Sequence, residues 1–412
     1  MTTHTTSIQA FESQPTTTTA PPLSRSRMVY LDNLRTVLIV AVVLGHLSVT
    51  YGLAADWYYK EGGETSPLVG AFGLVLLVIG LGFSMGLFSF IAGYFTVLAY
   101  DRKGAVKFLV DRLKRLGIPL LLFEIVINPL VHYMVDVHGG DCTGSLYDCQ
   151  FQGTFWGYLR EYPRLMRYSI GDGPVWFLEM MLIFSAFYAL WRMVNQQPAR
   201  TNLVKPVPNN RSIALFALAI GLITFFVRIW AGVLVFYEPL HLEFAHFPQY
   251  IALFIAGIWA YRNDWLTAFT NDQARLWRWI ALACIVVLPA MLVWFGALSG
   301  AVDERVIGGL NVFSLVYSIW EGFLSVSMVF TFLAWFRQSF NHQGKLARVM
   351  SEGTFAVYVL HPAIIVPFAL LLSGIRMNLN LKFLIVSPFA VALCYLVVYF
   401  LRKVPFAKVV LG

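Results

Sequence analysis

The sequence is poor in charged residues. Only 13% of its 412 residues are Asp, Glu, Lys or Arg, whereas soluble domains carry about 25%. Hydrophobic residues make up 58% of the chain, and the mean hydropathy is +0.68. This composition excludes an ordinary soluble domain and predicts a polytopic protein of the lipid bilayer. The net charge of +8 does not indicate nucleic-acid binding, because the positive residues lie in short loops between apolar segments.

Other signals are scarce as well. We find no repeat of 20–50 residues, no heptads, no phosphate-binding glycine loop and no Cys/His spacing of a metal site. The segment HLEFAH (241–246) lacks the two histidines at i and i+4 of a zinc helix, so we interpret it as a polar loop near a substrate entrance. We therefore expect no metal and no tightly bound cofactor.

The four cysteines carry little information about function. Cys142 and Cys149 lie in the largest predicted outer loop, where they either close a small disulfide loop in an oxidising compartment or stay reduced. Cys284 and Cys394 fall within apolar segments and are interpreted as small apolar residues.

The start of the chain has no cleavable apolar core. Residues 1–27 are polar and rich in Thr and Pro, which predicts a disordered cytoplasmic tail. Residues 28–412 form one predicted membrane domain.

Ten apolar windows predict an all-α integral membrane bundle of about ten transmembrane helices. The windows are 34–54, 68–100, 117–135, 174–194, 212–236, 247–261, 277–299, 311–336, 354–373 and 381–401. The second window is too long for one straight crossing, and its glycines predict tilt, tight packing or a broken helix. With the N-terminus inside, 22 of the 30 lysines and arginines lie in cytoplasmic segments, so both termini are predicted to be cytoplasmic in a multi-pass protein of the cell membrane.

Two ionisable residues share the first predicted span, LDNLRTVLIVAVVLGH. Eleven residues separate Arg35 from His46, which is roughly 20° past three helical turns, so both side chains lie on one face about 16 Å apart. Ionisable groups inside a span are functional candidates. An imidazole at mid-depth can take a proton from a hydroxyl or accept an acyl group, and an arginine at the rim can hold a phosphate. Alternatively, Arg35 is a topological anchor and His46 a histidine satisfied within the bundle.

The loop DRKGAVKFLVDRLKRLGIP follows the second window and adds a basic cluster. Arg112, Lys114 and Arg115 lie where a phosphorylated donor such as acyl-CoA would approach. The same cations can instead serve topology or contact lipid headgroups.

The fourth span begins with GDGPVWFLEMMLIF. Trp176 is either an aromatic of the membrane interface or a substrate contact. Glu179, one turn into the span, needs a partner, and Arg228 in the fifth span is the candidate. Such a pair is either structural or substrate-binding.

A second intramembrane histidine lies in the motif YVLHP of the ninth span. His361 is ten residues after Ser351 and so falls at roughly the depth of His46. Pro362 follows at once and is expected to loosen the backbone. Two histidines at similar depth favour a catalytic cavity.

Taken in order, these motifs resemble the acyltransferase family three membrane proteins. The family's arginine, ten residues and histidine are matched by Arg35 and His46, and FSFIAGYF (88–95), RLKRLGIP (112–119), GPVWFLEMMLIF (173–184), FPQYIALFIAGIWAYR (247–262) and FAVYVLHP (355–362) follow. The resemblance runs from about residue 28 to the C-terminus. It implies transfer of an acyl group, usually acetyl, from cytoplasmic acyl-CoA to a hydroxyl. It also implies that Arg35 and His46 are essential and that Arg112 and Arg115 assist.

We therefore predict a membrane O-acyltransferase. The donor phosphates would bind Arg35, Arg112, Lys114 and Arg115, His46 would be the base or the acyl carrier, and Trp176, Glu179, Arg228 and His361 would contact substrate. The acceptor would be a glycan, a lipid-linked sugar or a small hydroxylated molecule. The alternatives are a transporter or flippase, in which the polar residues mark a path, and a membrane scaffold.

Overall fold

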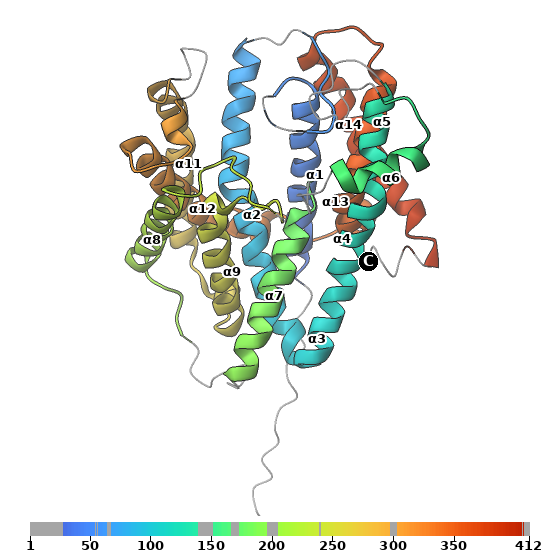
Figure 1. Cartoon of the computed structure of the whole chain (residues 1–412). Coiled ribbons are helices and arrows are strands. Elements are labelled where there is room, and N and C mark those ends of the chain that lie inside the picture. The colour runs from blue at the N-terminus through green and yellow to red at the C-terminus, as the bar shows by residue number, and fades with distance from the viewer. Residues whose placement is uncertain are drawn as a thin grey trace, which may run out of the picture.

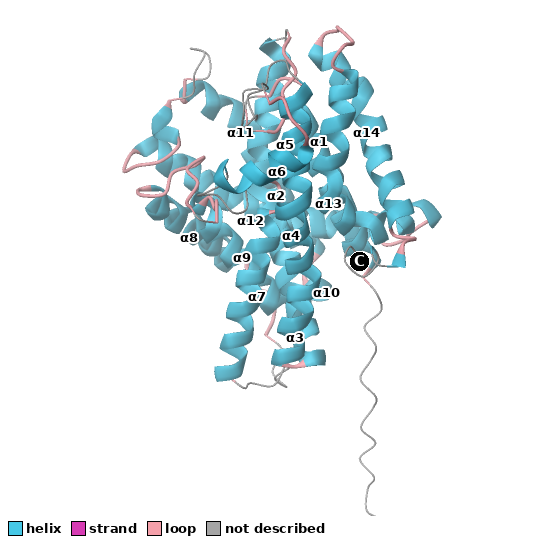
Figure 2. Ribbon diagram, turned by 45° about the vertical axis from the view of Figure 1, so that its right-hand side comes forward, coloured by secondary structure: helices cyan, strands magenta, loops and turns pink. Residues whose placement is uncertain are grey.

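The computed structural model describes residues 28–53, 55, 57–63, 67–138, 151–165, 173–195, 205–238, 240–296, 303–405 and 407. These residues form helices joined by loops, and no β-strand occurs among them (Figure 2). The predicted all-α membrane bundle is confirmed. The N-terminal tail and the pair Cys142 and Cys149 lie outside the described residues.

Nine segments in the described part are long and apolar enough to cross a membrane. Eight of them are formed by α1 (Val29–Thr50), α2 (Pro67–Lys103), α7 (Trp176–Val194), α8 (Asn210–Arg228), α11 (Asn271–Trp294), α12 (Val312–Ser339), α13 (Lys345–Leu372) and α14 (Leu379–Leu401). The predicted sixth span is α9 (Phe247–Arg262), whose 16 residues extend about 24 Å and so fall short of a hydrocarbon core of about 30 Å. The shorter elements are α6 (Phe155–Leu165), η3 (Phe244–His246), α10 (Trp265–Ala268) and η5 (Glu304–Val306).

The remaining span, residues 105–138, is interrupted twice. It consists of α3 (Ala105–Arg112), η1 (Leu113–Gly117), α4 (Ile118–Leu122), η2 (Phe123–Ile127) and α5 (Asn128–His138), and the two η elements are π-helical turns. A π-helical turn holds one residue more than an α-helical turn and is common at functional sites. Pro119 directly follows the first π-helical turn within this continuous helical run, and its missing N–H leaves the carbonyl of Arg115 without its usual helical donor.

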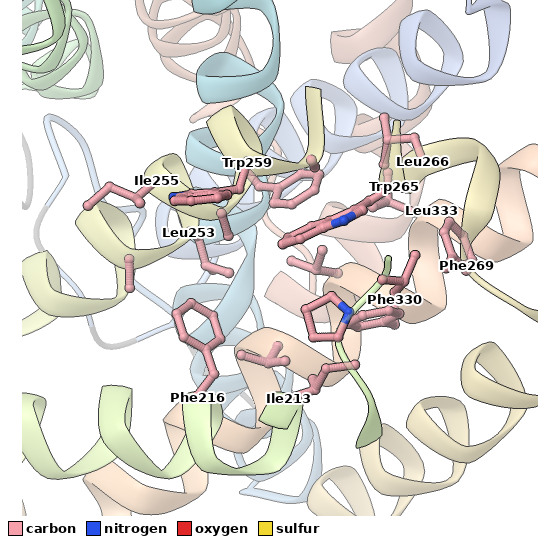
Figure 3. Close-up of a pocket in the computed structure, with 18 of the residues that line it drawn as sticks. Ile213, Phe216, Leu253, Ile255, Trp259, Trp265, Leu266, Phe269, Phe330 and Leu333 are labelled. Carbon is pink, nitrogen blue, oxygen red and sulfur yellow. The ribbon is translucent and has the colours of Figure 1, made fainter. Parts of the chain in front are cut away.

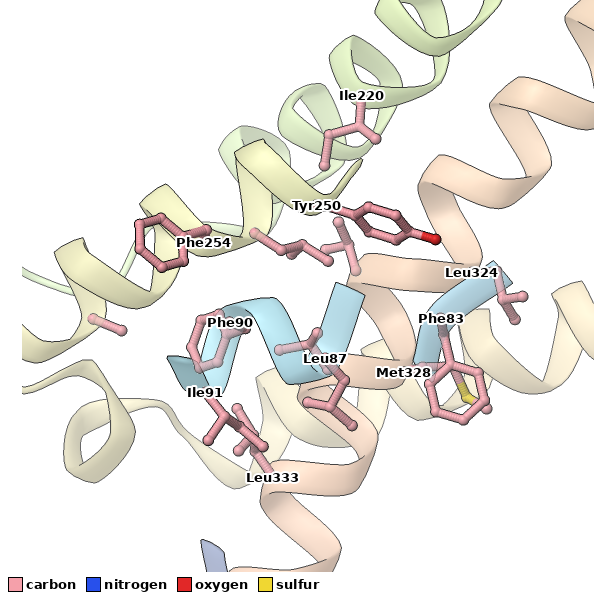
Figure 4. Packing of buried hydrophobic residues seen from close by; sticks show 14 of the residues in the cluster. Phe83, Leu87, Phe90, Ile91, Ile220, Tyr250, Phe254, Leu324, Met328 and Leu333 are labelled. Carbon is pink, nitrogen blue, oxygen red and sulfur yellow. The ribbon is translucent and has the colours of Figure 1, made fainter. Parts of the chain in front are cut away.

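The long second window forms one unbroken helix, and its glycines serve close packing against α9. A Cβ atom on Gly93 would lie 2.1 Å from the carbonyl oxygen of Phe254, and one on Gly257 would lie 2.1 Å from that of Phe90. The two backbones therefore touch, which only glycine permits. Phe90 and Leu87 of α2 and Phe254 of α9 belong to the hydrophobic core between these helices (Figure 4).

The bundle has two hydrophobic cores. One core lies among α2, α7, α8, α9, α11 and α12 and includes the first half of α1, and the other joins the second half of α1 with α5, α13 and α14. Figure 1 shows α8, α9, α11 and α12 on one side and α1, α13 and α14 on the other, with α2 between them. Helix α1, which carries His46, packs along α13, which carries His361.

Candidate active site

His46 of α1 and His361 of α13 form a hydrogen-bonded pair. Nδ1 of His46 lies 3.0 Å from Nε2 of His361, and the ring centroids are 5.0 Å apart. His361 is fully buried, and His46 is half-buried. The two imidazoles that the sequence places at similar depth are thus in direct contact.

Pro362 explains which nitrogen of His361 carries a hydrogen. A proline has no backbone N–H, so the carbonyl of Tyr358, four residues earlier, loses its normal helical donor. Nδ1 of His361 lies 2.7 Å from that carbonyl oxygen. Because a carbonyl only accepts, Nδ1 must donate, and Nε2 of the neutral ring is then an acceptor. The dipeptide His361–Pro362 therefore fixes its own tautomer while α13 continues unbroken.

The consequence for His46 follows by the same reasoning. Nε2 of His361 accepts a hydrogen bond, so Nδ1 of His46 donates it and Nε2 of His46 keeps a lone pair. No described residue forms a hydrogen bond with that nitrogen. This arrangement is that of an oriented base: one partner fixes the ring and the opposite nitrogen is available for a proton or an acyl group.

Aromatic groups enclose the pair. The indole of Trp57, from the segment after α1, stacks on His46 with centroids 4.1 Å apart and planes 11° apart. Tyr358 lies one turn before His361, and its hydroxyl donates to the carbonyl of Pro174 at 2.5 Å. This bond ties the start of α7 to the histidine-bearing turn of α13. A stacked indole excludes water from one face of His46 and stabilises a positive charge on the ring.

Arg35 lies on the same helix as His46, about 16 Å away, and has no hydrogen bond or ion pair to any described residue. The guanidinium of Arg112, at the end of α3, lies close enough that the two positive charges repel each other. Nε of Arg112 is buried without a partner, and its Nη2 reaches only Thr96 Oγ1, at 3.4 Å. Asp32 attracts Arg35 and Asp111 attracts Arg112, but neither carboxylate forms an ion pair with its arginine in the described structure. Two neighbouring guanidinium groups whose N–H groups are not taken up by carboxylates form a suitable site for a phosphate.

The other predicted cations lie on the exposed side of the basic segment. Lys114 and Arg115 occupy the π-helical turn η1, and both are exposed. Asp111 binds Arg115 at 3.2 Å and Lys103 at 2.7 Å. Only Arg112 of the predicted cluster therefore faces Arg35.

The comparison with protein families agrees with this geometry. A family model described as an acyltransferase domain matches residues 28–399, which is nearly the whole chain. The chain belongs to acyltransferase family 3. No curated protein and no solved structure matches it. Membership shows that this membrane protein is an acyltransferase that transfers groups other than aminoacyl groups. A transporter or scaffold without transfer chemistry is no longer a competing interpretation.

The predicted pairing of Glu179 with Arg228 is wrong in this family member. Arg228 binds Glu321 of α12, because α8 packs along α12. Glu179 is buried, and its Oε2 has no hydrogen-bond partner in the described structure. Trp176 packs on Tyr250 of α9, with ring centroids 5.8 Å apart. Glu179 and Trp176 therefore lie at the start of α7, near the turn that carries His361.

Arg228 belongs to a separate buried network that the sequence analysis missed. His246 Nδ1 lies 2.7 Å from Glu321 Oε1, and Arg228 Nη1 donates to Ser318 Oγ at 3.2 Å. Burial opposes a charge on His246, but Glu321 and Glu243 outweigh it and raise the pKa of His246 to about 9. His246, at the end of HLEFAH, is thus buried and bound to two carboxylates. The interpretation of this segment as a polar loop near a substrate entrance stays a prediction. Glu321 was detectable, since it is a carboxylate inside a predicted span, like Glu179.

A large cavity lies away from the histidines, between α8, α9, α10 and α12. Its volume is about 380 Å³, and Trp259, Trp265, Phe216 and Phe330 contribute to its walls (Figure 3). None of its lining side chains is titratable, so it offers no acid or base, and Ser212 supplies its one hydroxyl group. Among the described residues there is also no group of three His, Cys, Asp or Glu side chains that would hold a metal ion.

Proposed function

We propose that this family member transfers an acyl group, acetyl in the first instance, from cytoplasmic acyl-CoA to a hydroxyl group of a glycan or another envelope or secondary metabolite. The single observation that carries the proposal is the oriented His46–His361 pair, in which Nε2 of His46 keeps its lone pair and has no hydrogen-bond partner among the described residues. The proposal places the protein in the cell membrane with both termini in the cytoplasm.

In the reaction, Nε2 of His46 takes the proton of the acceptor hydroxyl as its oxygen attacks the thioester carbonyl. The carbon–sulfur bond breaks, and the CoA thiolate leaves with the proton that His46 then returns. His361 accepts a hydrogen bond from Nδ1 of His46 throughout, and the indole of Trp57 lies against the ring while it is charged. A base of this kind contributes roughly 10²–10⁴-fold to the rate.

The donor would lie along α1. Arg35 and Arg112 hold its phosphates, and the exposed Lys114 and Arg115 attract it from solution. About 16 Å separates Arg35 from His46 along the helix, which is comparable to the reach of a pantetheine arm. Glu179 would accept a hydrogen bond from an amide of that arm, a role supported by its buried oxygen without a partner in the described structure. Arg228 is not part of this proposal, because its charge is already bound by Glu321.

The test uses purified protein in liposomes with labelled acetyl-CoA and a mixture of hydroxylated acceptors. His46→Ala should lower CoA release at least 100-fold, whereas the matched control His342→Ala, an exposed histidine of a loop, should not. Equal activity of His46→Ala and wild type would refute the proposal. Acyl label trapped on His46 without acceptor would identify an acyl-histidine route in place of direct transfer.

The two arginine environments give a second test. Arg35→Ala removes charge-assisted hydrogen bonds of about 1.5–3 kcal/mol, so the KM for acetyl-CoA should rise roughly 10- to 150-fold. Arg115→Ala removes an exposed cation, so its smaller effect should disappear in high salt. An unchanged KM in Arg35→Ala would contradict the phosphate site.

A further inference from the structure

The segment after α1 carries three buried polar atoms that have no partner. They are Tyr51 Oη, Trp57 Nε1 and Glu61 Oε2, each without a hydrogen bond in the described part of the chain. The segment lies back against α1, since Trp57 stacks on His46 and the Glu61 amide donates to Thr50 O at 2.8 Å. A buried polar atom without a partner costs about 1–3 kcal/mol, so three in one segment require an explanation.

Lys382, near the start of α14, fixes this segment in place. Its ammonium group is almost fully buried and binds Glu61 Oε1, together with the carbonyl oxygens of Leu372 at 2.7 Å and Ile375 at 3.1 Å. The same group lies 5.8 Å from the ring of Tyr51. Because Lys382 neutralises Glu61 through Oε1 alone, Oε2 remains a hydrogen-bond acceptor without attracting a second cation.

An apolar groove adjoins Lys382 between α13 and α14. It has a volume of about 230 Å³, and Lys382 is the one charged residue in its lining. Its other walls include Phe368, Leu372, Ile385 and Phe389. Ile385 and Phe389 are also exposed on the surface of the bundle, on the side of α14 where lipid would lie. Two of the three unpaired atoms therefore belong to side chains, Glu61 and Tyr51, that lie beside the lysine of the groove.

We propose that these features form one binding site for an amphipathic acceptor, with its hydrocarbon tail in the groove and its hydroxyl groups on Tyr51, Trp57 and Glu61. The indole N–H donates, the carboxylate oxygen accepts and the phenol does both, which matches hydroxyl groups, since each of these donates and accepts. An anionic head is disfavoured because the ion pair of Lys382 with Glu61 leaves no net positive charge here, and the unpaired carboxylate oxygen Oε2 needs a donor that an anion lacks. The occupant is thus a neutral hydroxylated lipid, whose reacting hydroxyl lies beside His46. This inference rests on the proposed acyl transfer.

The tail can be tested with two acceptors that share a head. Wild-type protein in nanodiscs receives acetyl-CoA and either methyl β-glucoside or hexyl β-glucoside. We expect kcat/KM to be at least tenfold higher for the hexyl compound. Ile385→Trp, which fills the groove, should bring the hexyl value down to the methyl value. The control Ile255→Trp fills the separate apolar cavity and should keep the difference.

The head can be tested with Tyr51→Phe. This change removes an atom that has no partner, so the unfolding temperature should stay equal or rise. The KM for hexyl glucoside should nevertheless increase about tenfold. A merely structural hydroxyl would move neither KM nor the hexyl-to-methyl ratio.

The outcomes separate the two proposals. Equal kcat/KM for both glucosides, or acetyl-CoA turnover without transfer to either, would overturn the acceptor site and leave acyl-CoA chemistry standing. Absence of CoA release by well-folded wild type, with or without an acceptor, would overturn the proposed function itself.

Discussion

Replacing Pro362 by alanine should separate stability from activity. Alanine restores a backbone N–H that competes with His361 Nδ1 for the carbonyl of Tyr358, now bound at 2.7 Å. A hydrogen bond of this kind contributes about 1 kcal/mol net. Without the hydrogen bond to Tyr358, His361 can adopt either tautomer, and the fraction of correctly oriented His46 falls roughly fivefold. We therefore expect kcat to fall by that factor while the KM for acetyl-CoA stays constant.

Stability should change in the opposite direction or not at all. Alanine is about 3 kcal/mol better than proline inside a helix. Two ring methylenes of a buried side chain are lost, at about 0.8 kcal/mol each. The net change is therefore between zero and about 1.5 kcal/mol in favour of the variant, measured as the free energy of unfolding in detergent.

Pro367 provides the matched control, because it also lies inside α13 and no histidine is bonded to the carbonyl that it frees. Pro367→Ala should gain similar stability with unchanged kcat. Unchanged kcat in Pro362→Ala, together with an unchanged imidazole tautomer by ¹⁵N NMR, would refute the reasoning.

Three further predictions concern the rest of the bundle. Glu321→Gln leaves Arg228 buried with a weaker partner, so it should destabilise by about 3–5 kcal/mol, and adding Arg228→Met should recover much of this loss in denaturant titrations. Because the pKa of His246 is raised to about 9 in the folded protein, its stabilising contribution is complete below about pH 6.5 and is lost as the pH rises through 9. The unfolding temperature should therefore fall between pH 7 and 10, and His246→Gln should abolish this fall. Gly93→Ala should disrupt folding because its Cβ would meet a backbone carbonyl of α9, whereas Gly80→Ala, with open space around it, should be tolerated in a thermal-shift assay.

The sequence predicted the histidine pair well, because helical rise alone sets the depth of a residue within a span. His46 and His361 follow from counting along two apolar windows, and their contact needs only that α1 and α13 be neighbours. For the long second window, tight packing was one of the three predictions made from its glycines, and it is observed at Gly93. Span counting was weakest at α9, whose helix is too short to cross on its own.

Partners across the bundle could not be predicted in the same way. Arg228 has more than one carboxylate at suitable depth, and the choice of Glu321 depends on α8 lying along α12. Trp57 belongs to a segment without periodicity, and its position over His46 depends on the distant Lys382. Neither contact leaves a local pattern in the sequence.

The two π-helical turns in residues 105–138 decide which side of α5 faces the bundle. Each turn accommodates one extra residue, which rotates everything after it by about 100° relative to a plain helix. The buried stripe of Asn128, His132 and Asp136 faces the protein only because both residues are present. Together the two extra residues rotate this polar face by about 200°, from the bilayer toward the bundle. Deleting one residue from each turn would return the stripe to the lipid.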